Sequence, residues 1–381
     1  MKPEFRKKIS AVAFCMGLLC ELYVMPSGYA FGWYHEKEII AVGMVFFAIS
    51  ILSSMNIKKD ALPFMLLGAY GIAAFRYQHS ALILRVIFAI LAGRDKDRDK
   101  TVAVFCAGNG FLLIYTGFLA ALGIHNTLTL TGQYRSLDGE LRWCFGFYHP
   151  NGFALFMFRE FLLLLYVIFR YTEGKKKILL ILADIMICGG FIILSGSKMA
   201  AAALIIVGIL ALGAAFIKKL IYDRLLFACA AGITFLQIAF VIIFAFVPFP
   251  RIRYGRGDTF LEILNVLTTG RLLNTKRLFE SAVPTLFGRR SGLVLSEMGF
   301  SNALYSEGVI FVALLALVSV LIAYLLYKER NRGGLLMLTG ITGYALAESY
   351  LPYFNKNCLW LMCIGIGLYE LKNGEKKVEN K

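Results

Sequence analysis

The sequence lacks the clusters of cysteine and histidine that commonly bind metal ions. It has eight cysteines and four histidines but no CxxC pair, and six of the cysteines lie inside apolar runs. It also shows no internal repeat and no low-complexity segment. Charged residues make up only 17% of the chain, against 59% hydrophobic residues, whereas a soluble domain averages about 45–50% apolar residues. These shortages argue against a metal site and a soluble domain, and they predict an integral membrane protein.

The net charge of +16 does not indicate nucleic-acid binding. The charges sit in short clusters between apolar runs of roughly 15–25 residues, which is the pattern of a polytopic helical membrane protein.

We therefore expect an all-α fold with about twelve transmembrane helices, or ten to twelve because three runs are short. The expected spans are 9–25, 39–56, 61–76, 80–93, 101–122, 151–169, 178–194, 199–217, 225–249, 303–326, 335–350 and 357–370. The whole chain is read as a single polytopic domain.

The charges also predict an orientation. If the N-terminus is cytoplasmic and the chain alternates, the cytoplasmic segments hold 24 of the 40 lysines and arginines, and the other side holds 14. Both termini are then cytoplasmic, in agreement with the excess of positive charge that cytoplasmic loops carry.

Two extracytoplasmic loops are long, at 123–150 and 250–302, while most cytoplasmic connections have four to eight residues. Loop 250–302 is basic, since eight cations face four anions. These are Arg251, Arg253, Arg256, Arg271, Lys276, Arg277, Arg289 and Arg290, against Asp258, Glu262, Glu280 and Glu297. Positive charge is normally scarce on this side, so we expect an anionic partner there.

Within loop 250–302, Asp258–Leu267 and Arg271–Val283 both have apolar residues at helical spacing. Thr269 is a plausible N-cap, which places Arg271 in the first turn of a helix. A cation is disfavoured there by the helix dipole unless an anion is bound at the same place. The alternative is an interfacial helix whose arginines face water or lipid headgroups.

Loop 123–150 ends in a second polar group, formed by Arg135, Arg142, His149 and Asn151, and Pro150 helps to start the next helix. An imidazole at a membrane boundary is suited to accept a proton or to bind a sugar hydroxyl. The alternative is a purely structural helix start with an interfacial histidine.

Lys198 ends a predicted turn, Ser195–Lys198, and is again a cation on the side where positive charge is scarce. The alternative to a functional role is a structural turn whose lysine extends its amino group to the interface. Four charged residues lie within expected spans, either as functional groups or as structural pairs. They are Arg85, Arg159, Glu160 and Asp184. Glu348 closes the eleventh span as an acid, a base or a salt-bridge partner.

Three stretches in this order resemble the O-antigen ligase and Wzy-type polysaccharide polymerase superfamily. They are SGSKMAAAALIIVGIL, then TTGRLLNTKRLFESAVPTLFGR in the basic loop, then SNALYSEGVIFVALLALVSVLIAYLLYK. The segment from Arg142 to Asn151 is similar to the stretch before the family's middle helices. Two departures are that Ser301 stands where ligases usually have histidine, before Asn302, and that Lys198 replaces an arginine. The missing histidine favours a polymerase over a ligase.

The resemblance implies a GT-C-like membrane glycosyltransferase that needs no metal or other cofactor and acts on undecaprenyl-diphosphate-linked oligosaccharides at a bacterial cell membrane. It implies polymerisation of repeat units into capsule, exopolysaccharide or O-antigen, beside a flippase and a chain-length regulator. Arginines would stabilise the diphosphate leaving group, since their planar fork makes two contacts to phosphate. The expected catalytic residues are His149 and Arg271. The expected substrate-binding residues are Arg135, Arg142, Asn151, Lys198, Arg277 and Asn302, while Glu297 and Glu307 are alternative proton acceptors.

Three other classes stay open. A ligase would move finished glycan to an acceptor. A flippase or other transporter for lipid-linked sugars would be expected to show repeat symmetry and a charged central cavity. The third class is a non-catalytic membrane scaffold.

Overall fold

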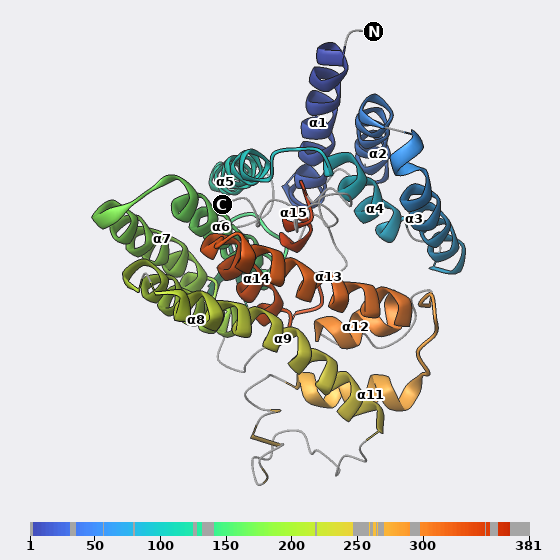
Figure 1. Cartoon of the computed structure of the whole chain (residues 1–381). Coiled ribbons are helices and arrows are strands. Elements are labelled where there is room, and N and C mark those ends of the chain that lie inside the picture. Colours follow the sequence, from blue (N-terminus) through green and yellow to red (C-terminus); the bar gives the residue numbers. More distant parts are fainter. Residues whose placement is uncertain are drawn as a thin grey trace.

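Helices occupy the predicted apolar runs in the computed structural model of the chain (Figure 1). Each of the first eleven expected spans overlaps a helix. The helices are α1 (Pro3–Ala30), α2 (Glu36–Ser54), α3 (Ile57–Gln78), α4 (Leu82–Gly93), α5 (Arg98–Ala121), α6 (Pro150–Tyr171), α7 (Gly174–Leu194), α8 (Lys198–Phe216), α9 (Leu220–Phe246), α11 (Arg271–Ser281), α12 (Gly299–Ser306), α13 (Val309–Lys328), α14 (Arg332–Tyr344) and α15 (Leu359–Met362). The structure describes residues 3–30, 36–55, 57–78, 81–124, 128–131, 141–217, 219–246, 259, 262–263, 265, 270–289, 298–346, 348–350 and 357–365.

Seven of the described helices are long and apolar enough to cross a membrane, namely α2, α5, α6, α7, α8, α9 and α13. The prediction of a helical, multi-pass membrane protein is thereby confirmed, whereas the number of twelve spans stays a prediction. Helix α14 has only 13 residues. The last expected span, 357–370, contains in its described part only the four-residue helix α15.

Helices α6 and α14 form the centre of the bundle. In α6, 78% of the most apolar stretch is buried, and α14 packs on α6, α8, α9 and α13. The outer helices expose large apolar side chains instead, such as Met186, Ile193 and Ile209. An apolar surface of this kind is suited to lipid.

The tenth expected span begins later than predicted. Residues 299–306 form the separate helix α12, and α13 starts at Val309 after a break at Gly308. Gly308 has a φ of +96°, and a β-carbon there would lie 2.4 Å from the backbone nitrogen of Gly288. Only glycine fits this conformation and this close approach, so the backbone breaks the helix at a position that hydrophobicity alone does not reveal.

Apart from polar contacts buried within the bundle, such as those of Arg85 and Asn109, many polar contacts between segments lie in two groups at opposite ends of the bundle. One end brings together 94–100, 170–173, 217–223 and 329–332, through the ion pairs Arg98–Glu329, Arg170–Asp99 and Arg332–Asp223. These are all segments that the charge pattern assigns to the cytoplasm.

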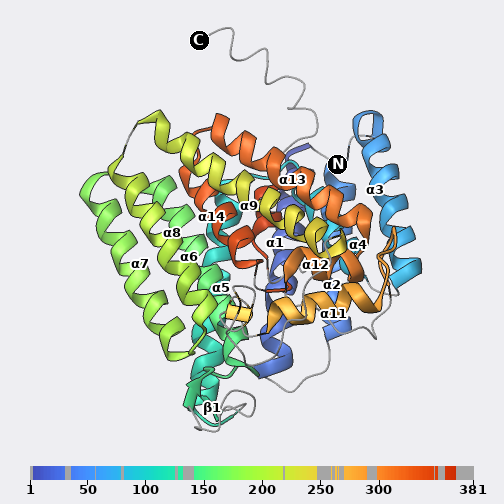
Figure 2. The same ribbon diagram turned by 90° about the horizontal axis from the view of Figure 1, so that it is seen from below.

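The other end, called here the loop end, carries segments assigned to the outer side. It includes the β-hairpin formed by β1 (Thr129–Thr131) and β2 (Leu141–Trp143), which pair antiparallel. Figure 2 shows this hairpin at the bottom, with α7 and α8 running lengthwise above it. It also includes α11, which packs on α9.

Helices α1 and α4 are joined by a buried ion pair. The Arg85 guanidinium donates from Nε to Oε1 of Glu21 at 3.0 Å and from Nη2 to Oε2. Both side chains are almost fully buried, at 7% and 1% exposure. The expectation that Arg85 forms a structural pair is therefore confirmed.

We predict that Arg85→Met destabilises the protein by about 3–5 kcal/mol, because it leaves the Glu21 carboxylate buried without its partner. Thermal unfolding in detergent measures the change. The double variant Glu21→Met/Arg85→Met removes both charges and is expected to recover most of the loss. A double variant as unstable as the single one would contradict this explanation.

Candidate functional site

Helix α11 begins at Arg271, as its periodicity predicts, and ends two residues before the expected Val283. The N-cap is Gly270, with a φ of 85°, rather than Thr269, which lies outside the described residues. Asn265 fixes the first turn, since its Oδ1 accepts from the Leu273 amide at 3.0 Å and its carbonyl accepts from Gly270 at 2.7 Å. Asn265 thus satisfies the Leu273 amide, one of the first-turn amides that have no acceptor within the helix.

Arg271 is buried and forms an ion pair with Glu348, which follows α14. The distance from Nη2 to Oε1 is 2.8 Å, and the Arg271 side chain is only 4% exposed. A carboxylate of the protein thus supplies the anion expected beside this cation at the start of α11. Of the three interpretations of Glu348, that of a salt-bridge partner is confirmed.

Arg142 lies on β2 and reaches two other segments. Its Nε donates to the carbonyl of Ser195 at 2.8 Å, and its Nη2 donates to Oδ1 of Asn151 at 2.9 Å. The predicted grouping of Arg142 with Asn151 is confirmed, and the Ser195–Lys198 turn joins them. The arginine is half-buried.

His149 is the N-cap of α6. Its Nδ1 accepts from the Asn151 amide at 3.1 Å, and Pro150 occupies the first helical position. The predicted helix start at Pro150 is therefore confirmed, whereas a chemical role of His149 stays a prediction. The imidazole itself is exposed.

Tyr344, the last residue of α14, lies near the Ser195–Ser197 turn and near the Arg271–Glu348 pair. Its hydroxyl is buried and has no hydrogen-bond partner among the described residues. The contacts of Arg142 and those of Arg271 are thus two neighbouring sets with Tyr344 close to both. We call the two sets together the two-arginine site, which comprises Arg142, Asn151, Ser195, Ser197, Arg271, Tyr344 and Glu348.

The remaining predicted site residues lie apart from these contacts or outside the described residues. Lys198 is exposed at the first position of α8, and Arg277 is exposed on α11. Asn302 is buried in α12, and its Oδ1 has no hydrogen-bond partner within the described part of the chain. Arg135 lies outside the described residues, as do Glu297 and most of the expected helix 258–267.

The sequence analysis did not identify Tyr344 or Ser197 as site residues. Tyr344 lies in the apolar sequence LTGITGYALAES, four residues before Glu348. That spacing places two side chains on the same face of a helix. The sequence signal for this part of the site was therefore a pair of polar residues, Tyr344 and Glu348, four positions apart near the end of an expected span.

A second polar group, at Glu307, lies between α12 and α13. Gln78 at the end of α3 donates from Nε2 to the carbonyls of Phe287 at 2.7 Å and of Glu307 at 3.2 Å. The Glu307 carboxyl is buried, and its Oε2 has no hydrogen-bond partner among the described residues. Burial raises the pKa of this carboxyl to about 7.

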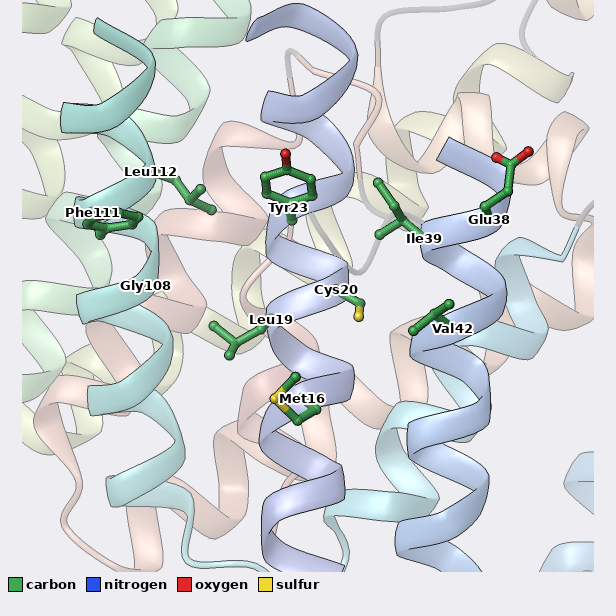
Figure 3. A pocket seen from close by; sticks show the side chains of 10 residues that line it. All are labelled: Met16, Leu19, Cys20, Tyr23, Glu38, Ile39, Val42, Gly108, Phe111 and Leu112. Atoms are coloured by element: carbon green, nitrogen blue, oxygen red, sulfur yellow. The ribbon is translucent and has the colours of Figure 1, made fainter. Parts of the chain in front are cut away.

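An apolar groove of about 480 Å³ runs between α1, α2 and α5. Figure 3 shows its side chains pointing between the three helices, with Tyr23 and Glu38 toward one end. The lining residues are Met16, Leu19, Cys20, Tyr23, Glu38, Ile39, Val42, Gly108, Phe111 and Leu112. An almost wholly apolar groove on a membrane-embedded bundle has the chemistry to hold a hydrocarbon chain.

The described residues contain no group of three or more His, Cys, Asp or Glu side chains arranged to hold a metal ion. Comparison of the chain with protein-family models gave no match, and comparison with curated proteins gave none either.

The raised pKa of Glu307 predicts a pH effect on stability. The stabilisation by protonated Glu307 is fully present below the ordinary carboxyl pKa of 4.5 and is lost as the pH rises to about 7. The free energy of unfolding falls over this range because Glu307 ionises at a lower pH in the unfolded chain than in the folded protein. We expect a loss of up to about 3 kcal/mol, measured as a lower unfolding temperature at pH 8 than at pH 5.

Glu307→Gln is expected to remove this part of the pH dependence, because the amide stays neutral. The matched control is Glu280→Gln, on the exposed side of α11, which is expected to keep it. If the unfolding temperatures of Glu307→Gln and of the control change with pH to the same extent, the burial of Glu307 does not govern its ionisation.

Proposed function

We propose that this protein is a membrane glycosyltransferase that polymerises undecaprenyl-diphosphate-linked oligosaccharide units into a surface polysaccharide. The reaction takes place at the outer face of a bacterial cytoplasmic membrane, at the loop end of the bundle. The resemblance of three ordered stretches supports the family, and the two-arginine site supports the chemistry.

The observation that carries the proposal is that Arg142 and Arg271 are each held in place by partners from other segments at the loop end. One comes from the 123–150 loop and the other from the 250–302 loop, and the turn before α8 and the end of α14 lie between them. Two guanidinium groups and the first turn of α11 together suit a diphosphate, since both arginines and helix N-termini bind phosphate. A diphosphate leaving group gains negative charge as its bond to sugar breaks, and fixed cations stabilise that charge.

Glu348 has a defined place in this proposal. Its carboxylate holds Arg271 when substrate is absent, and a diphosphate oxygen takes over that contact when substrate binds. Arg271 is thereby kept in position, because its buried guanidinium has an anionic partner in both states.

In the transfer step, an acceptor sugar hydroxyl attacks the anomeric carbon of the growing chain, and the bond from that carbon to diphosphate breaks. The hydroxyl proton passes to a base, for which we propose His149. Because Nδ1 accepts the Asn151 amide, the neutral imidazole carries its own proton on Nε2, and the basic nitrogen is Nδ1. His149 therefore takes the hydroxyl proton on Nδ1 once its contact with the Asn151 amide is released.

The arrangement of the ends supports the proposed location. Segments that alternate along the sequence meet at two separate ends, which is consistent with an alternating topology. The distribution of lysine and arginine favours an extracytoplasmic loop end.

The test is turnover by the purified protein in lipid nanodiscs, with lipid-linked repeat units as substrate. We expect longer glycans on the lipid carrier in the presence of a chelator, without ATP and without an ion gradient. Movement of intact units across the membrane with no change in glycan length would instead indicate a flippase.

We predict that Arg271→Ala lowers polymerisation about 100- to 1,000-fold, the usual cost of losing one group that stabilises transition-state charge. Arg271→Lys is expected to recover little, because lysine lacks the planar fork. Arg224→Ala, an exposed arginine on α9 at the opposite end, is the control. Long polymer made by Arg271→Ala at a normal protein level would exclude Arg271 from the site.

The variant Glu348→Gln tests whether Arg271 contacts substrate or only forms a structural ion pair. If Arg271 binds diphosphate, this variant lowers the KM for lipid-linked substrate, because a weaker partner now competes for the arginine. If the ion pair only holds α11 in place, Glu348→Gln loses activity to the same extent as Arg271→Ala.

A further inference from the structure

Four polar residues with no part in the proposed reaction meet at the middle of three membrane helices. Asn109 lies near the middle of α5, Arg159 and Glu160 near the middle of α6, and Asp184 near the middle of α7. All four are buried, with exposures between 0% and 8%. Ionisable groups at this depth are costly, so their protonation has to be accounted for.

Arg159, Asn109 and Glu160 form one connected set. The Arg159 guanidinium donates to Oδ1 of Asn109, and the Asn109 amide donates to Oε2 of Glu160 at 2.7 Å. The guanidinium also lies over the Phe156 ring at 4.1 Å. Glu160 therefore has an amide donor and a nearby cation, which together suit an ionised carboxylate.

Asp184 has much weaker support. Its Oδ1 accepts only from the thiol of Cys188 at 3.3 Å, and its Oδ2 has no hydrogen-bond partner within the described part of the chain. A thiol is a weak donor. Asp184 belongs to the inward stripe of α7, with Ile181, Cys188 and Ile192, so it faces the bundle and not lipid.

Among the residues that the structure describes, the charged and titratable groups around Asp184 offer it no cation. Glu160 on α6 is a neighbouring carboxylate, and Cys106 on α5 is a thiol. The positive charge of Arg159 interacts with the carboxyl group of Glu160. The α8 residues that face α7, such as Leu204, are apolar. The described residues around Asp184 thus include the carboxyl group of Glu160 but no guanidinium, so an ionised Asp184 would be buried beside a like charge.

We propose that Asp184 is a proton-binding site at mid-depth in the bundle, occupied at neutral pH. Its neighbour Glu160 is ionised, and the positive charge of Arg159 compensates the negative charge of Glu160. The site is independent of the proposed glycosyl transfer, although α7 connects it to the two-arginine site. Asp184 lies three turns before Leu194, and the next residue is Ser195, which accepts from Arg142.

Infrared spectroscopy of the full-length protein in lipid tests the proposal, since a protonated carboxyl has a C=O stretch that an ionised carboxylate lacks. The wild-type spectrum at pH 7 is compared with that of Asp184→Asn, which has the shape of a protonated aspartate. Glu307, with a pKa of about 7, contributes a protonated-carboxyl band of its own, so the spectra are compared in a Glu307→Gln background. In that background we expect the protonated-carboxyl band to be lost in Asp184→Asn and kept in Glu160→Gln. Loss in Glu160→Gln alone would place the proton on Glu160 and overturn the assignment.

Labelling aspartate side chains with ¹³C in the wild-type protein gives the same answer without a substitution. A protonated-carboxyl band at pH 7 that shifts on aspartate labelling supports the proposal, with its assignment to Asp184 taken from the variant. A spectrum in which no such band shifts contradicts it. Asp184→Asn is also expected to unfold at the wild-type temperature, whereas an ionised and paired Asp184 would make that variant clearly less stable.

Discussion

The ion pair between Arg271 and Glu348 is the contact on which the functional account depends. It joins residues 77 positions apart, and it holds the first turn of α11 against the end of α14. Without it, a buried guanidinium at a helix N-terminus would have neither a carboxylate nor favourable dipole energy. In the proposed reaction the same property favours an anionic substrate, because an anion replaces the negative charge of Glu348 beside the buried Arg271.

Local sequence patterns predicted most of the helices and two helix starts at the site. The apolar spacing after Gly270 placed Arg271 at the start of a helix, and Pro150 placed the start of α6, because both depend on residues close in sequence. The break at Gly308 was missed, since it depends on close approach to Gly288 across the fold. The tenth span was therefore drawn too long, while the seven long apolar helices were recognised from composition alone.

The partners of the site residues were not predictable in the same way. The helix dipole indicated that Arg271 needs an anion, but a bound ligand and a protein carboxylate satisfy that need equally, and the sequence does not distinguish them. Arg142 likewise finds Ser195 across 53 residues. Tertiary packing sets such contacts, and the same holds for Asp184, whose lack of a cation is evident only from its neighbours on α5 and α6.

The central claim is polymerisation at the loop end, and glycan chain length in cells that lack this protein tests it most directly. The account predicts single repeat units on their normal carrier, exported but not extended. Full-length polymer left on undecaprenyl diphosphate would contradict it and indicate a ligase. Loss of every extracytoplasmic unit would also contradict it, and would assign the two-arginine site to transport.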